Sequence, residues 1–201
     1  MKRFFLVMSM MALTVSAFAQ REVGVFTIQP KLGLNIANIT DADDSDPRFG
    51  LVAGAESEWQ VTKMISLSTA LLYSAQGDKE SGYNTNGVPV KLTAQLDYIN
   101  IPIMANIYAA KGLAFKLGVQ PGFCVRSEYE LKGGGVTVSG SMSDIGISIN
   151  TFDLSIPVGI SYEYKNFVID GRYNFGITNM VKGDTKNRVI QFTIGYRFDL
   201  K

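Results

Sequence analysis

The chain has 201 residues, with 19 basic and 18 acidic side chains, one cysteine and no histidine. This length suits one domain, and the balanced charge leaves no basic surface for nucleic acid. A single cysteine excludes an internal disulfide framework, and the lack of histidine removes the commonest metal ligand and the commonest general base. We therefore expect no catalytic residues, no metal site and no cofactor.

The first residues have the pattern of a secretory signal peptide. Two basic residues precede a largely apolar run at residues 4–13, and Ala17-Phe-Ala19 supplies the small residues that a signal peptidase needs. The run is shorter than the roughly 20 apolar residues of a membrane-spanning helix. The sequence therefore predicts a signal peptide at residues 1–19 and one mature domain at residues 20–201.

After this segment, apolar and polar residues alternate with a period of two. Phe115, Leu117 and Val119 share one face of such a stretch, whereas Lys116 and Gly118 share the other. Long and tight links alternate between these stretches, as in bacterial outer-membrane barrels. The alternation predicts eight strands, near residues 25–38, 49–61, 65–76, 92–108, 113–130, 152–164, 167–178 and 187–199.

The composition of the polar face indicates which side of the sheet meets lipid. In the cores of six strands every charged residue lies on that face, which also carries many glycines and serines. One Arg or Lys on the lipid face at the midplane would cost roughly 2–4 kcal/mol. Small residues suit the narrow interior of an eight-stranded barrel. The prediction is an all-β, eight-stranded antiparallel up-and-down transmembrane β-barrel; a soluble lipocalin-type barrel with an apolar interior remains the alternative.

Aromatic residues gather near the predicted strand ends, where amphipathic rings favour the two membrane interfaces. We expect them to form an aromatic girdle. Its predicted members are Phe26, Trp59, Tyr73, Phe115, Tyr162, Tyr164, Phe167, Tyr173, Tyr196 and Phe198.

Charged residues on the polar face predict a network inside the barrel. Unpaired charges in an enclosed space are costly, so opposite signs should pair and fill the lumen, which excludes a general diffusion pore. A catalytic or transport cluster is the alternative. The predicted members are Glu56, Glu58, Lys116, Arg126, Glu163, Asp170, Arg172 and Arg197.

Two further features need an explanation. Prolines within predicted strands remove ladder hydrogen bonds, so we expect bulges or shifted register there, with a phase change near Tyr98 and Ile99. The acidic segment 41–46 invites a calcium interpretation, but Asp46 stands where the turn glycine is needed and Val52 where the bidentate glutamate is needed. We expect a solvated loop. The strand prolines are Pro30, Pro102, Pro121 and Pro157.

Four segments together resemble the PorT-like outer-membrane β-barrel family of Bacteroidetes-type bacteria. They are Leu72–Gly77, Tyr98–Met104, Gly118–Phe123 and Asp170–Asn179. The resemblance implies a signal peptide, a Gram-negative source and the cell outer membrane, but it implies little about activity. The chain departs from the common ending in an aromatic residue, because three residues follow Phe198.

The predicted function is that of an integral outer-membrane barrel with a side-chain-filled lumen and a structural or interaction role, without catalysis. Its partners would be outer-membrane lipid and an envelope or extracellular protein, bound through loops 77–91 and 131–151. No nucleic acid is expected. The alternatives are a narrow-pore transporter for small solutes and a soluble periplasmic ligand-binding barrel.

Overall fold

The computed structural model describes residues 21–39, 45–83, 89–180 and 185–200. No helix in this part of the chain is long and apolar enough to cross a bilayer. The elements are β1 (Phe26–Ile39), β2 (Ser45–Gln60), β3 (Ile65–Tyr83), β4 (Pro89–Asn100), β5 (Ile103–Ala110), β6 (Leu113–Gly133), β7 (Val136–Ser141), the short 3-10 helix η1 (Met142–Ile145), β8 (Phe152–Tyr164), β9 (Phe167–Asn179), β10 (Lys186–Tyr196) and β11 (Phe198–Leu200).

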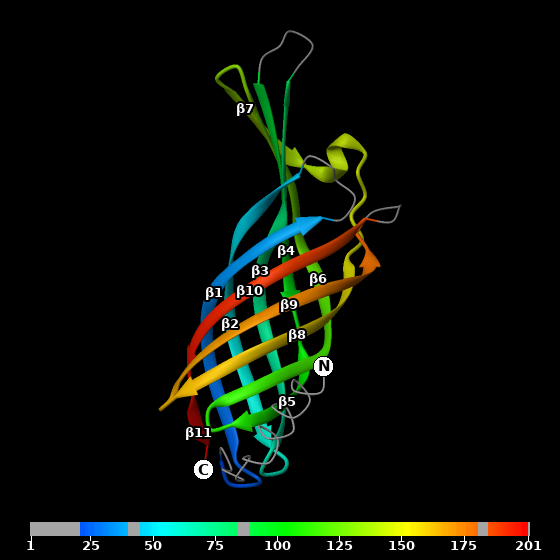
Figure 1. Ribbon diagram of the computed structural model, residues 1–201. Helices are drawn as coiled ribbons and strands as arrows, with labels where there is room; N and C mark the ends of the chain where they lie inside the picture. The colour runs from blue at the N-terminus through cyan, green and yellow to red at the C-terminus, as the bar shows by residue number, and fades with distance from the viewer. Residues whose placement is uncertain (1–20, 40–44, 84–88, 181–184, 201) are drawn as a thin grey trace, which may run out of the picture.

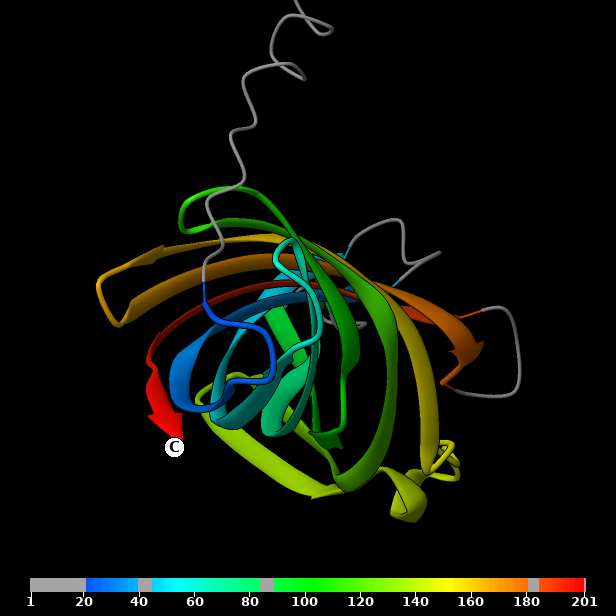
Figure 2. The same ribbon diagram turned by 90° about the horizontal axis from the view of Figure 1, so that it is seen from below.

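The antiparallel strands close into a ring, which Figure 2 shows from one end. β1 completes the ring because it pairs with β2 on one side and with β10 and β11 on the other. Two wall strands are interrupted. One consists of β4 and β5, and the other consists of β10 and β11. The wall therefore has eight strands, and the predicted fold class is confirmed.

The two ends of the barrel differ in their links, as predicted. Tight turns join β2 to β3, β5 to β6 and β8 to β9 at the end where the carboxyl terminus lies (Figure 1). The predicted loops at the other end are wrong in extent. Most of 77–91 belongs to β3 and β4, and 131–151 contains the end of β6, all of β7 and η1. Their alternation was missed because their outer face is no longer apolar.

The two faces of the wall have opposite chemistry. Along β1, Gln29, Lys31 and Asn35 point into the lumen and are buried, whereas Leu32 and Leu34 point outward and are 54 % and 56 % exposed. Such a surface in water would be a large aggregation hazard, but it suits contact with lipid. The prediction that the apolar face lies outside is confirmed, which contradicts the alternative of an apolar interior.

Inward-facing glycines let neighbouring strands approach closely. A Cβ added at Gly33 would lie 1.9 Å from the Phe192 carbonyl oxygen, and one at Gly54 would lie 2.0 Å from that of Leu71. No side chain fits at such distances without a shift of the backbone. Glycine at these positions therefore permits the tight coiling of a narrow barrel.

The strand prolines interrupt pairing without shifting it. Pro30 lies opposite the break between β10 and β11, Pro102 separates β4 from β5, and the β6–β8 ladder has a gap opposite Pro157. The Pro121 carbonyl accepts a hydrogen bond from the Ile101 N–H at 2.9 Å. Because proline has no N–H, Pro121 donates none. Along the described strands none of the register shifts falls at these four prolines. The expected shifts there are therefore wrong, because a missing donor breaks one bond without adding a residue.

The expected phase change near Tyr98 is present. The pairing of β4 with β6 moves by one residue between Asp97 and Tyr98, which leaves Val125 of β6 as a bulge. Two other sequence predictions, the signal peptide at 1–19 and most of the acidic segment 41–46, lie outside the described residues.

Candidate functional site

Five buried charged residues meet in the middle of the lumen, and we call them the middle cluster. Lys31 of β1 donates to Glu56 of β2 at 2.8 Å, and Lys116 of β6 donates to Glu56 and to Asp170 of β9 at 2.9 Å each. Arg172 donates to Asp170 at 2.8 Å and lies 3.4 Å from Glu56. None of these side chains is more than 2 % exposed. The cluster therefore joins strands from different sides of the ring across the lumen.

A second group, the lower cluster, lies nearer the tight turns. Arg197 bridges Glu58 and Glu163 at 2.8 Å each, and Arg21, which precedes β1, pairs with Glu163 at 2.7 Å. Tyr108 donates to Glu58. Carboxylates and cations therefore alternate across this level of the lumen as well, and removal of any one partner would leave a buried charge unpaired.

The structure brings together seven of the eight residues predicted for the network, in these two clusters. The eighth, Arg126, lies outside the lumen: its side chain is 46 % exposed and pairs with Glu128 at 2.5 Å. The Val125 bulge is the reason, because one extra residue turns every later side chain of β6 to the opposite face.

Sequence reasoning also omitted members of the clusters. Lys31 shares the polar face of β1 with Gln29 and Gly33, and this alternation could have identified it. Arg21 precedes the first strand and Tyr108 resembles an interface aromatic, so neither carried a sequence signal. Their roles follow only from the closed ring.

Above the middle cluster the lumen is lined by amides instead of charges. Gln76, Gln120, Asn174 and Asn187 surround a narrow cavity that also reaches Asp153. Both polar side-chain atoms of Asn174 and both of Gln191 lack a protein hydrogen-bond partner in the described chain. Because an unmade buried hydrogen bond costs about 1–3 kcal/mol, these amides need water or a polar ligand.

An apolar layer covers this chamber at the mouth. Leu96, Tyr98 and Met180 are buried together, and Cys124 and Ile149 pack against them. The interior therefore changes in layers, from ion pairs through amides accompanied by one carboxyl group, that of Asp153, to apolar side chains.

All ten residues predicted for the aromatic girdle lie on the outer surface. Nine of them are exposed and Tyr173 is half-buried. Phe26 stacks on Trp59 at 6.2 Å, and the Phe167 and Tyr196 rings meet edge to face at 5.1 Å. The rings thus form contacts between neighbouring strands at the tight-turn end.

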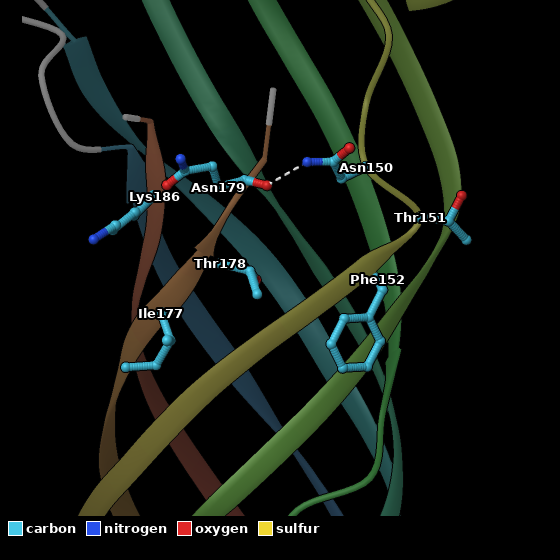
Figure 3. A pocket seen from close by; sticks show the side chains of 7 residues that line it. All are labelled: Asn150, Thr151, Phe152, Ile177, Thr178, Asn179 and Lys186. Carbon is cyan, nitrogen blue, oxygen red and sulfur yellow. Dashed lines mark hydrogen bonds between the residues drawn. The ribbon is translucent and has the colours of Figure 1, made fainter. Parts of the chain in front are cut away.

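The wall opens slightly between β8 and β9 near the mouth. Their ladder ends at the pair Ser155 and Gly176, and above it the Leu154 N–H donates to the Thr178 hydroxyl at 2.8 Å. The resulting groove has a volume of about 740 Å³. Figure 3 shows its lining, which is Asn150, Thr151, Phe152, Ile177, Thr178, Asn179 and Lys186.

Strands β3, β4 and β6 continue beyond the wall, and β7 joins them as a fourth strand. Figure 1 shows them rising above the barrel; we call residues 77–83, 89–96 and 126–141 the extension. On the face that continues the lumen side, β3 contributes Asp78, whereas β4, β6 and β7 carry mainly apolar residues. They are Val90, Leu92, Ala94, Tyr129, Leu131, Val136 and Val138.

The opposite face of the extension is polar. It continues the lipid-facing side of the wall but carries mainly charged and hydroxyl residues, among them Lys91, Glu128, Glu130, Lys132, Thr137 and Ser139. The change begins at Asp97, which accepts a hydrogen bond from the Tyr73 hydroxyl at 2.6 Å and lies 3.6 Å from Arg126. Polar residues on an outward face are incompatible with lipid, so one boundary of the bilayer lies at this level.

Comparison with known proteins agrees with this geometry. The sequence profile of a family described as outer membrane protein beta-barrel domain matches residues 18–182. Comparison with curated protein sequences gave no significant match.

The fold is similar to that of solved outer-membrane barrels. The attachment invasion locus protein Ail of Yersinia pestis is 15 % identical, with a TM-score of 0.50, over 88 % of this chain and 100 % of that one. Neisserial surface protein A is also 15 % identical, with a TM-score of 0.46, over 87 % and 97 %. These likenesses show the fold. The family profile, which matches most of the chain, makes it an outer-membrane protein, so the soluble periplasmic alternative is wrong.

Proposed function

Because the chain belongs to the outer membrane protein beta-barrel domain family, we propose that it is a closed membrane anchor that holds a recognition surface outside the cell. One observation carries this proposal. The lumen is crossed by two layers of buried ion pairs, while three wall strands continue past the membrane boundary into a four-stranded sheet. The chain thus forms an extended surface outside the membrane, whereas its lumen is filled by side chains.

The finer assignments belong to this proposal. The motifs quoted above favour the PorT-like branch and a Gram-negative source, and the first 19 residues favour export by a signal peptide. The absence of histidine and of any recognisable nucleophile arrangement in the sequence favours a role without catalysis. The aromatic girdle would fix the height of the barrel in the bilayer.

The recognition surface proposed here is the extension, together with the links at the same end. It contains most of loops 77–91 and 131–151, which the sequence predicts to be contact regions for an envelope or extracellular protein. Val136 and Val138 are exposed in the described part of the chain and form an apolar area outside the bilayer that a partner can cover.

Trimming residues 131–151 to a short Gly-Ser link tests this function. We expect the trimmed chain to remain a heat-modifiable barrel in the outer membrane but to lose its partners in cross-linking on intact cells. The matched control replaces Lys111 and Lys165 at the opposite end with alanine and should keep them. Identical cross-linked products from the trimmed and full-length chains would contradict the proposal.

A narrow transporter is the second candidate, favoured by the amide-lined chamber below the mouth. It predicts solute uptake into liposomes that disappears when Arg172 or Glu58 is replaced. The anchor function instead predicts no stable large conductance in planar bilayers, because the ion pairs leave no continuous aqueous path. A stable conductance would favour the transporter.

A further inference from the structure

The edge of β7 that faces away from β6 is open. β7 pairs with β6 from Val136 to Ser141, and within the described chain no strand pairs with its other edge. In the wall β1 closes the ring, and among the described wall strands only the three-residue β11, at the tight-turn end, has a single neighbour. At the opposite end, the extension is the place where this fold leaves a row of backbone groups without strand partners.

The direction of these backbone groups follows from the end of β7. The Ser141 N–H donates to the Asp144 carboxylate of η1 at 3.1 Å and therefore does not point toward β6. Alternate residues of a strand direct their N–H groups to the same side. The N–H groups of Thr137 and Ser139 thus also point to the open edge.

This edge lacks the features that usually block strand pairing. Exposed edge strands are commonly protected by charged side chains, proline or a bulge. β7 has the sequence Val-Thr-Val-Ser-Gly-Ser, with no charge and no proline, and its pairing with β6 runs without a register shift. The neighbouring charges are already engaged, because Lys132 pairs with Glu130 at 2.8 Å and Arg126 with Glu128.

We propose that the open edge of β7 binds an extended segment of another polypeptide by strand addition, a mode of recognition that rests on the proposed function. The added strand continues the β4–β6–β7 ladder, and its carbonyl oxygens accept hydrogen bonds from the N–H groups of Thr137 and Ser139. Its side chains alternate, with apolar residues beside Val136 and Val138 and small polar residues beside Thr137 and Ser139. Because the charged side chains of the neighbouring β6 are already paired with one another, the partner strand needs no net charge.

A second copy of the chain is a poorer occupant. Copies in one membrane are related by an axis along the membrane normal, and rotation about that axis keeps the upward direction of a strand. Two β7 edges would then meet in parallel and could not form the antiparallel ladder that β6 and β7 form. The partner strand therefore comes from a different polypeptide.

The test uses the full chain in lipid nanodiscs and a fluorescein-labelled peptide that copies residues 127–133, the segment that already fits β7 on its closed side, with Glu128, Glu130 and Lys132 replaced by serine. We expect saturable binding by fluorescence polarisation. Amide exchange should slow at Thr137 and Ser139 but not at Val138, whose N–H already faces β6. A peptide N-methylated at alternate residues, which lacks the necessary donors, should bind at least about tenfold more weakly.

Substitutions on the edge provide a second readout. Thr137→Pro removes an outward N–H and should weaken peptide binding about tenfold, whereas Thr137→Val keeps the N–H and should stay within about twofold. Ser139→Pro is the alternative should Thr137→Pro not fold, as judged by heat modifiability. Equal binding of the N-methylated peptide, or exchange protection at Val138 instead of its neighbours, overturns strand addition.

The two proposals fail in distinguishable ways. If trimming residues 131–151 removes cellular partners but the peptide does not bind, the extension recognises partners by another surface and strand addition is wrong. If trimming leaves the partners unchanged, the proposed function itself is wrong. Concentration-dependent dimers that Thr137→Pro abolishes would identify a second copy as the occupant and overturn the assignment to a different polypeptide.

Discussion

The wall and the extension share strands β3, β4 and β6, yet their apolar residues lie on opposite faces. In the wall, Val119 points to lipid and Lys116 points to the lumen. In the extension, Leu131 lies on the lumen side and Lys132 on the outer side. The surrounding solvent explains this reversal: hydrocarbon requires an apolar outer face, whereas water favours a polar one.

The two regions also differ in how they satisfy their backbone. In the wall β1 to β6 and β8 to β10 each have neighbours on both sides, as the bilayer requires, and only the short β11 at the tight-turn end has one. The extension stands in water and can leave β7 with one neighbour. Stability in the wall therefore depends on closure and on buried charge pairs, whereas the extension tolerates change more readily.

The largest difference in unfolding free energy between the wall and the extension is expected when a charged side chain is removed, because the charges in the wall are buried. Glu56→Ala leaves three cations of the middle cluster without their shared partner, so the free energy of unfolding should fall by about 3–5 kcal/mol. The control Glu130→Ala removes only the exposed pair with Lys132 and should change little. Urea unfolding in lipid vesicles measures both. Equal effects would mean that the lumen is more hydrated than the buried ion pairs imply.

The second largest difference between the wall and the extension is expected when a charge is placed on the outer face. Val158→Arg puts a cation near the middle of a lipid-facing strand and should cost about 2–4 kcal/mol. Thr137→Arg puts a cation on the outer face of the extension, where Thr137 is exposed and water can solvate the charge, and should leave the free energy of unfolding nearly unchanged. A comparable loss from both would place the extension within the bilayer and contradict the assigned boundary.

Glycine replacement tests the difference in packing. Gly33→Ala puts a methyl group 1.9 Å from the Phe192 carbonyl oxygen and should cost about 1–3 kcal/mol. Gly82→Ala in the extension meets no atom within 4 Å and should be neutral or stabilise the fold by up to about 1 kcal/mol. Thermal unfolding of the two variants, followed by heat-modifiability gels, checks the sign. A tolerated Gly33→Ala would show that the strands can separate at that point.

The smallest effect is expected at Arg126. Its side chain is exposed on the outer face, so Arg126→Ala should not measurably change unfolding, whereas Arg172→Ala should destabilise the chain about as strongly as Glu56→Ala. The same urea titrations make this comparison. A large loss at Arg126 would mean that the Val125 bulge does not turn it out of the lumen in the folded protein.

Sequence patterns predicted the wall well because lipid imposes a strict rule. The strand at 152–164 matches β8 at both ends, and seven of eight network residues lie inside, since period-two alternation fixes the side of each residue. The rule fails where lipid ends. Beyond Asp97 the outer face is polar, so the upper parts of β3 and β4 looked like loops although they are paired strands.

By itself, the sequence determined the fold class, the number of wall strands and the side on which most wall residues lie, because one face of every spanning strand must be apolar. Only the tertiary structure decided which charges meet, where the bulge turns Arg126 outward and which edge stays open. These properties depend on strand register and ring closure, and both are set by contacts between residues far apart in the chain, such as Lys31 with Glu56 and Arg21 with Glu163.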